Sequence, residues 1–150
     1  MTKYFLLSPE VAGQLGKDTV IDTTVTPPLV EKLHYEFDGW LGDDILESFP
    51  CFICTEKLAI RLKKNNIKGY LLDGVTVSKS ETFIEIYPDK ELPSFYWLKI
   101  VGAKDDDLIL STNGSLLVSE KALSVFRQTN INYCDFEEYH SPTKGNGFAT

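Results

Sequence analysis

Histidine and cysteine are scarce in this chain, which has two histidines and three cysteines among 150 residues. An odd number of cysteines does not make the disulfide framework of a small secreted protein, so we expect reduced thiols. The only histidines are His34 and His140, which leaves little material for general-base catalysis. A catalytic triad is therefore not expected.

Long apolar runs and phosphate-binding motifs are also missing. No stretch of the sequence approaches the length of a membrane-spanning helix. The segment Met1–Leu7 is followed by Ser8-Pro9 and is too short for a secretion signal, so a cytoplasmic protein is expected. Residues 144–147, Lys-Gly-Asn-Gly, lack the strand and helix that a nucleotide-binding loop requires. We expect no cofactor.

Basic residues are outnumbered by acidic ones. There are 22 acidic and 15 basic residues, which give a formal net charge of -7. A negative field disfavours nucleic acid and anionic membranes as partners and favours a basic protein surface. The hydrophobic content of 43% suffices for one core. The sequence predicts a single domain at residues 1–140, with a flexible tail at residues 141–150.

Two segments share one residue pattern. Residues 52–67 align without gaps with residues 116–131, and each copy predicts a strand, a helix and a second extended segment. Thr55 and Ser119 stand at the N-cap position, where a hydroxyl accepts from the free N–H groups of the first helical turn. A glutamate follows each cap, at the positive end of the helix dipole. Each helix has one apolar stripe, so both should pack on a sheet.

Extended segments account for much of the remaining chain. Aromatic, β-branched and alternating residues predict strands or extended segments at Lys3–Leu7, Leu33–Phe37, Gly69–Leu72, Thr82–Tyr87, Ser94–Val101 and Tyr133–Phe136. A polar turn is predicted at residues 104–107, and Leu108–Leu110 continues from it toward the second copy. Residues 8–28 are predicted to be mostly loop, with a short strand at Val20–Ile21, and a helical turn is expected at Asp43–Phe49. The predicted fold is α+β, with a mixed, mostly antiparallel sheet and two similar helices packed on one face.

Four segments are similar to a class of small bacterial proteins. They are Leu46–Ile53, Phe95–Lys99, Leu117–Leu123 and Cys134–Tyr139. Over roughly residues 39–139 the chain resembles immunity proteins of contact-dependent and polymorphic toxin systems. That resemblance implies stoichiometric inhibition of a cognate toxin by tight binding and assigns no active site. The strand–Ser/Thr–Glu–Lys–helix pattern that it includes is common in proteins.

Acidic clusters and one tryptophan are the candidate binding residues. Surface charge of one sign speeds encounter with a basic partner and orients it. Trp40 lies near glycines, in a setting typical of an exposed loop, and is either a binding anchor or a core residue. Adjacent carboxylates can also hold a metal ion, but no calcium-loop spacing accompanies them, so no metal site is expected. The predicted partner-binding residues are Trp40, Asp43, Asp44, Asp105, Asp106, Asp107, Glu137 and Glu138.

Cys51 and Cys54 have the spacing found in zinc and redox sites. On a strand, however, residues three apart point to opposite faces, and no second pair completes a tetrahedral site. Both thiols, and Cys134, are interpreted as core residues. Three functions stay open: an immunity-type inhibitor, a small hydrolase-type enzyme that uses its carboxylates, and a structural subunit of a bacterial assembly.

Overall fold

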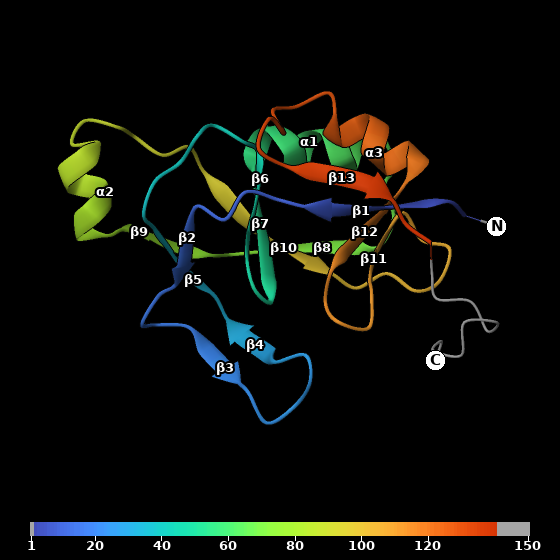
Figure 1. The fold of residues 1–150 in the computed structure, drawn as a ribbon, viewed down its shortest axis with the longest axis horizontal. Helices are drawn as coiled ribbons and strands as arrows, with labels where there is room; N and C mark the ends of the chain where they lie inside the picture. Colours follow the sequence, from blue (N-terminus) through green and yellow to red (C-terminus); the bar gives the residue numbers. More distant parts are fainter. Residues whose placement is uncertain (1, 141–150) are drawn as a thin grey trace.

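The computed structural model describes residues 2–140, so the predicted tail at residues 141–150 lies outside the described residues. Within this range there are three helices and thirteen strands, and the strands form four sheets. Figure 1 shows how these elements are arranged. The helices are α1 (Glu56–Lys64), α2 (Glu81–Ile86) and α3 (Glu120–Phe126). The strands are β1 (Tyr4–Ser8), β2 (Gly13–Leu15), β3 (Val20–Asp22), β4 (Leu29–Lys32), β5 (His34–Phe37), β6 (Ile45–Ser48), β7 (Cys51–Thr55), β8 (Tyr70–Asp73), β9 (Thr76–Lys79), β10 (Phe95–Ile100), β11 (Leu108–Leu110), β12 (Leu116–Ser119) and β13 (Asp135–Glu138). The predicted α+β class is confirmed.

Two four-stranded antiparallel sheets form the main body. The first sheet has the strand order β6-β7-β10-β8, and the second has the order β11-β12-β1-β13. Helix α1 packs on β7 and β10, α3 packs on β12 and β1, and the two helices contact each other (Figure 1). The structure therefore differs from the predicted single sheet, because each helix has a sheet of its own. Apolar residues of both layers, such as Leu62 and Phe126, meet in one core.

The repeat seen in the sequence extends further in three dimensions. In order and pairing, β6, β7, α1 and β8 correspond to β11, β12, α3 and β13. The spacing of 64 residues that separates Thr55 from Ser119 also separates Asp73 from Glu137, at the ends of β8 and β13. The chain thus contains two copies of a hairpin–helix–strand unit.

In each of the two main sheets, one of the two central strands precedes the other unit in the chain. β1 precedes the first unit along the chain but pairs with β12 and β13 in the second sheet. β10 precedes the second unit but pairs with β7 and β8 in the first sheet. The registers correspond, because Tyr4 lies opposite the cap residue Ser119 and Phe95 lies opposite the cap residue Thr55. Each unit thus completes its sheet with the strand that precedes the other unit in the chain, an arrangement that we call the exchange of strands.

A second core covers the outer face of the first sheet. β5 pairs antiparallel with β2 and parallel with β9, and this three-stranded sheet faces β7 and β10. The side chains of β7 alternate between the cores, so that Phe52 joins the helical core and Ile53 joins the second core. Tyr35, Phe37 and Phe83 are fully buried in the second core. These three aromatic residues therefore pack internally.

Two local predictions were wrong. Residues 82–87, predicted as a strand, lie mostly in α2, whose cap Ser80 accepts from the Phe83 N–H at 3.2 Å. Residues 43–49, predicted as a helical turn, contain β6, which is paired with β7. No helix within residues 2–140 has the length and apolar character needed to cross a membrane.

Candidate functional site

Two of the predicted binding carboxylates, Asp43 and Asp44, are buried, with exposed fractions of 0% and 4%. Asp44 accepts hydrogen bonds from the Thr55 hydroxyl and the Asn130 N–H, both at 2.7 Å. Asp43 accepts from the N–H groups of residues 132 and 133 at 2.9 and 2.7 Å. Burial raises the pKa of Asp43, and these two hydrogen bonds oppose the shift. The prediction that this pair forms part of an acidic surface was wrong, because both carboxylates hold β6 against the loop after α3.

Asp107 has the same role in the second unit. It accepts from the Ser119 hydroxyl at 2.7 Å and from the Lys68 N–H at 2.9 Å. Each of the two aspartates, Asp44 and Asp107, therefore connects the N-cap of its own helix to the chain that leaves the other helix. This reciprocal connection satisfies both carboxylate oxygens and fixes the two units relative to each other.

Of the three acidic residues in the turn before β11, Asp105 is exposed, whereas Asp106 and Asp107 are half-buried. Asp106 accepts from the Ala103 N–H at 2.8 Å, and its carbonyl accepts from the Tyr4 hydroxyl, also at 2.8 Å. Asp105 adopts a positive φ of 75°, which a tight turn requires. Two of these three predicted binding residues thus shape the turn, and Asp105 is the one that faces solvent.

Glu137 and Glu138 are exposed on β13, at the edge of the second sheet. Lys3 lies 3.7 Å from Glu138, but both side chains are about half exposed, so this ion pair contributes little to stability. Charged residues on an edge strand discourage pairing with another chain through the backbone. These two carboxylates, together with Asp135 on the same strand, are accessible to a partner through their side chains.

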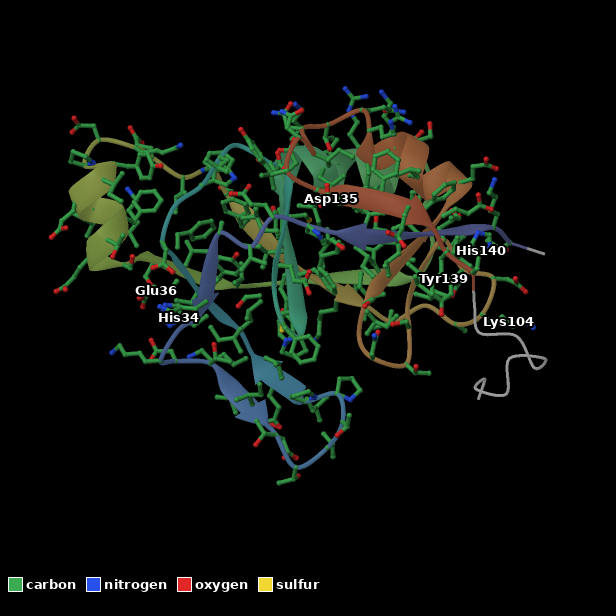
Figure 2. All side chains as sticks on the ribbon, in the orientation of Figure 1. His34, Glu36, Lys104, Asp135, Tyr139 and His140 are labelled. Atoms are coloured by element: carbon green, nitrogen blue, oxygen red, sulfur yellow. The ribbon has the colours of Figure 1, made fainter. Side chains whose placement is uncertain are left out.

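Basic residues gather on the two longer helices. Helices α1 and α3, with the C-cap residue of α3 included, carry two acidic and six basic residues. The basic residues are Lys57, Arg61, Lys63, Lys64, Lys121 and Arg127. The rest of residues 2–140 carries 20 acidic and eight basic residues. Figure 2 shows nitrogen-bearing side chains projecting from the helical layer. The negative field of the protein therefore originates outside that layer.

Trp40 is half-buried at the edge of the second core. Its Nε1 donates to the Asp43 carbonyl at 2.9 Å, and its ring meets the Phe95 ring edge-on at 5.9 Å between centroids. The Lys90 ammonium donates to the Trp40 carbonyl at 2.6 Å and lies 4.9 Å from the centroid of the Tyr87 ring. The indole therefore packs partly inside, while Trp40 also lines a surface cavity beside α2.

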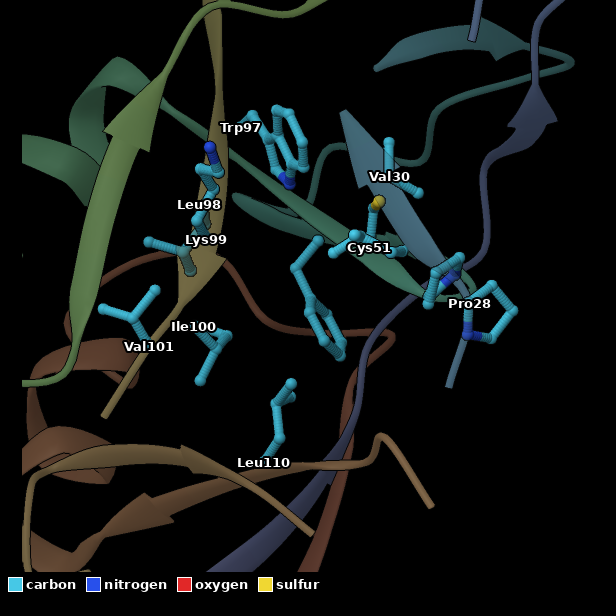
Figure 3. Close-up of a pocket in the computed structure, with 12 residues that line it drawn as sticks. Pro28, Val30, Cys51, Trp97, Leu98, Lys99, Ile100, Val101 and Leu110 are labelled. Carbon is cyan, nitrogen blue, oxygen red and sulfur yellow. The ribbon is translucent and has the colours of Figure 1, made fainter. Parts of the chain in front are cut away.

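A different cavity, of about 180 Å³, opens beside the hairpin of β3 and β4 (Figure 3). Its lining is largely apolar and includes Pro28, Val30 and Trp97. Lys99 lies over the Trp97 ring at 4.5 Å from its centroid and 3.2 Å from a carboxylate oxygen of Asp73, so its charge is already paired. This lining suits an apolar contact.

The three cysteines are buried and free. Cys51 lies in the second core and Cys54 in the helical core, so the prediction that they face opposite sides of the strand is confirmed. Burial raises the pKa of each of the three thiols, Cys134 included, to about 12. These thiols are protonated at neutral pH and are poor nucleophiles. Within residues 2–140 no three or more His, Cys, Asp or Glu side chains are grouped to hold a metal ion.

His34, which Figure 2 labels, belongs to a group that resembles a catalytic triad. Its Nε2 lies 2.7 Å from the Ser78 hydroxyl, and its Nδ1 lies 3.8 Å from an Asp18 carboxylate oxygen. However, Nδ1 accepts a hydrogen bond from the Asp18 backbone N–H at 3.2 Å, so the ring proton is on Nε2. Nε2 therefore donates a hydrogen bond to the Ser78 hydroxyl. A triad needs the reverse, with Nδ1 donating to the carboxylate and Nε2 accepting from the serine.

Packing around His34 also indicates a structural role. The imidazole is buried, and a Cβ at Gly16 would lie within 2.5 Å of its ring atoms, so only glycine fits there. No local pattern marks this group in the sequence, because its members lie in three separate segments. They join the loop before β3 to the sheet of β5 and β9.

Comparison with known proteins adds no assignment. No family model matches the chain, and no curated protein matches it.

Proposed function

We propose that this protein is a non-catalytic, cytoplasmic protein-binding domain of the immunity type, which neutralises a cognate bacterial toxin by direct binding through an acidic surface. The observation that carries the proposal is the separation of charge. The helical layer is basic, whereas the rest of residues 2–140 has 20 acidic residues against eight basic ones. The acidic part of the protein attracts a basic partner, and the basic helical layer repels the same partner. This difference orients the partner as the two proteins meet.

The accessible residues of this surface differ in what they offer. Asp105, Glu137 and Glu138 supply exposed carboxylates near the second sheet, and Trp40 supplies a partly exposed aromatic ring near α2. A partner held by such contacts is blocked by steric coverage of its own active site, with no covalent step. Inhibition is then stoichiometric.

The experiment that tests the proposal begins with a partner captured from the native bacterium by the tagged full-length chain. The captured domain should arrest growth when it is expressed alone in a bacterial host, and co-expression of this chain should restore growth. Titration of the purified proteins should give complete inhibition at a 1:1 ratio. Growth arrest that this chain does not relieve, or inhibition at well below one equivalent, would contradict the proposal. The second outcome would favour an enzyme.

The acidic surface is tested by charge reversal in the same complex. The triple variant with Asp105→Lys, Glu137→Lys and Glu138→Lys should slow association roughly tenfold at low salt, because electrostatic steering is lost. The matched variant with Lys57→Glu, Lys63→Glu and Lys64→Glu changes as many charges on the helical layer and should not slow association. Equal association rates for the acidic-surface variant and the unmodified chain would exclude this surface.

A further inference from the structure

Three separate segments enclose a surface cavity of about 370 Å³ beside α2. They are residues 10–13 between β1 and β2, residues 38–41 after β5, and residues 86–87 at the end of α2. The first two are joined directly, because the N–H groups of Asp38 and Gly39 donate to the Ala12 carbonyl at 2.8 and 3.2 Å. Backbone hydrogen bonds thus hold two of the three cavity walls in place before any ligand binds.

Glu10 lines this cavity and has one oxygen without a partner. The residue is 9% exposed, and its Oε2 accepts from the Leu41 N–H at 3.1 Å. Its Oε1 is the one buried side-chain oxygen or nitrogen within residues 2–140 that no hydrogen bond of normal geometry reaches, although the Asp43 N–H lies close enough to lower the pKa of the carboxyl. A buried carboxylate oxygen without a donor is unfavourable, so a donor supplied from outside would be bound there.

The rim of the cavity is aliphatic and exposed. Val11, Leu41 and Ile86 are 67%, 55% and 59% exposed, although each is a large apolar side chain. Trp40 and Tyr87 also line the cavity. The site therefore combines apolar walls at the surface with an unpaired acceptor below them.

The local charge is negative. Asp38 is exposed and lines the cavity, and the buried Asp43 acts on Glu10 as a further negative charge. Lys90 is the cation that acts on Glu10, and its ammonium is bound to the Trp40 carbonyl. A cationic ligand is therefore favoured over a neutral donor.

We propose that this Glu10 cavity receives one lysine or arginine side chain of a protein partner. The methylene groups of such a side chain match the aliphatic rim, and its charged head supplies the donor that Oε1 of Glu10 lacks. A bare metal ion would gain nothing from the apolar rim. The class of partner rests on the proposed function, whereas the ligand chemistry of the cavity follows from its own residues.

The cavity is tested with the full-length chain and small probes, by two-dimensional NMR of its backbone amides. Nα-acetyl-lysine amide and Nα-acetyl-arginine amide, which keep their charged side chains, should shift the backbone amide signals of Ala12, Gly39 and Leu41 in a saturable manner. N-acetyl-norleucine amide has the stem without the ammonium group and should cause shifts at least fivefold smaller at equal concentration. Equal shifts with norleucine, or shifts centred on β13 instead, would overturn the proposal.

Two variants and one control complete the test. Glu10→Gln should weaken lysine binding at least fivefold, because the charge of the acceptor is lost. Val11→Asn changes an exposed side chain, which keeps folding intact, and should also weaken binding. The control Asp105→Asn removes a charge outside the cavity and should bind the probe normally. Undiminished probe binding by both cavity variants would refute the assignment.

The outcome is separable from that of the proposed function. Within a toxin complex, Glu10→Gln should accelerate dissociation about tenfold, since the contact is short-ranged, and leave association nearly unchanged. If the chain binds the lysine probe but neutralises no toxin, the cavity assignment stands and the function fails. If the chain neutralises a toxin equally well with Glu10→Gln, the function stands and the cavity assignment fails.

Discussion

Asp44 and Glu10 are both buried carboxylates, but their surroundings are opposite. Both oxygens of Asp44 accept hydrogen bonds, from the Thr55 hydroxyl and the Asn130 N–H. Glu10 has a donor for one oxygen, from Leu41, and none for the other. Substitution of Asp44 therefore removes stabilising contacts, whereas substitution of Glu10 removes an unpaired charged atom.

Asp44→Ala should lower the free energy of unfolding by about 2–3 kcal/mol, because it leaves the buried Thr55 hydroxyl and the partly buried Asn130 N–H without their acceptor. Asp107→Ala should cost less, about 1–2 kcal/mol, since water can reach this half-buried site. Urea denaturation measures both values. The exposed Asp105→Ala is the control, with an expected change within about 0.5 kcal/mol. Equal effects of Asp44→Ala and Asp105→Ala would disprove the connecting role.

Glu10→Gln should change how stability depends on pH. Burial raises the pKa of Glu10 in the folded state, so the folded protein binds this proton more tightly than the unfolded chain does. The resulting stability is present below the unfolded pKa and is lost as pH rises through the folded pKa. Glutamine does not titrate, so the variant should gain stability relative to the unmodified chain as pH rises above about 4.3. Denaturation at pH 4 and pH 7 measures this difference, and a relative loss by the variant would contradict it.

Burial of the aspartates could not be inferred from the sequence. Asp43 and Asp44 are adjacent acidic residues in a loop, a pattern that usually indicates solvent exposure. Their backbone N–H partners lie 86 to 90 residues further along the chain, so no local pattern marks the two aspartates as buried. The cap residues Thr55 and Ser119 were predicted correctly, because a cap and its helix are neighbours in the sequence.

At the scale of elements, all three helices begin with the same two-residue pattern. Thr55, Ser80 and Ser119 are N-caps, and a glutamate follows each of them. α2 was predicted as a strand because Thr82–Tyr87 alternates between apolar and polar residues, which is typical of β structure. The cap of α2 was the signal that would have identified it, and burial of Phe83 then holds the short helix against the second core.

Ser80→Ala should lower the free energy of unfolding by about 1 kcal/mol, because the Phe83 N–H loses its acceptor. Ser80→Asp keeps an acceptor at the N-cap and should retain most of that stability. The matched control is Ser124→Ala, at an exposed position inside α3, where no loss is expected. Chemical denaturation compares the three. A Ser80→Ala variant as stable as the control would exclude the capping role.

At the scale of the whole molecule, the repeat was visible in the sequence but the exchange of strands was not. Residues 4–7 and 95–98 have similar aromatic and aliphatic composition, so either segment suits either sheet. Strand pairing is decided by contacts between distant residues, which a local pattern does not contain. The predicted single sheet therefore differs from the two sheets of the structure, each of which contains a strand that precedes the other unit.

Deletion of residues 1–8 should abolish the cooperative unfolding transition, because β12 and β13 lose the strand that lies between them. A synthetic peptide of these residues should restore the transition when it is added back. The control variant replaces residues 23–27, in the loop between β3 and β4, by two glycines. Its free energy of unfolding should change by less than about 1 kcal/mol. Circular dichroism during heating follows all three samples. A cooperative transition in the truncated chain without peptide would contradict the exchanged arrangement.

The exchange of strands also determines how the protein must be made. β1 leaves the ribosome well before its neighbours β12 and β13, because β12 begins 108 residues after β1 ends. At typical translation speeds this interval is on the order of ten seconds. During that time an apolar strand has no native partner and is open to aggregation. We therefore expect the nascent chain to need a chaperone, or temporary pairing of β1 elsewhere, until the second hairpin emerges and β12 pairs with β1.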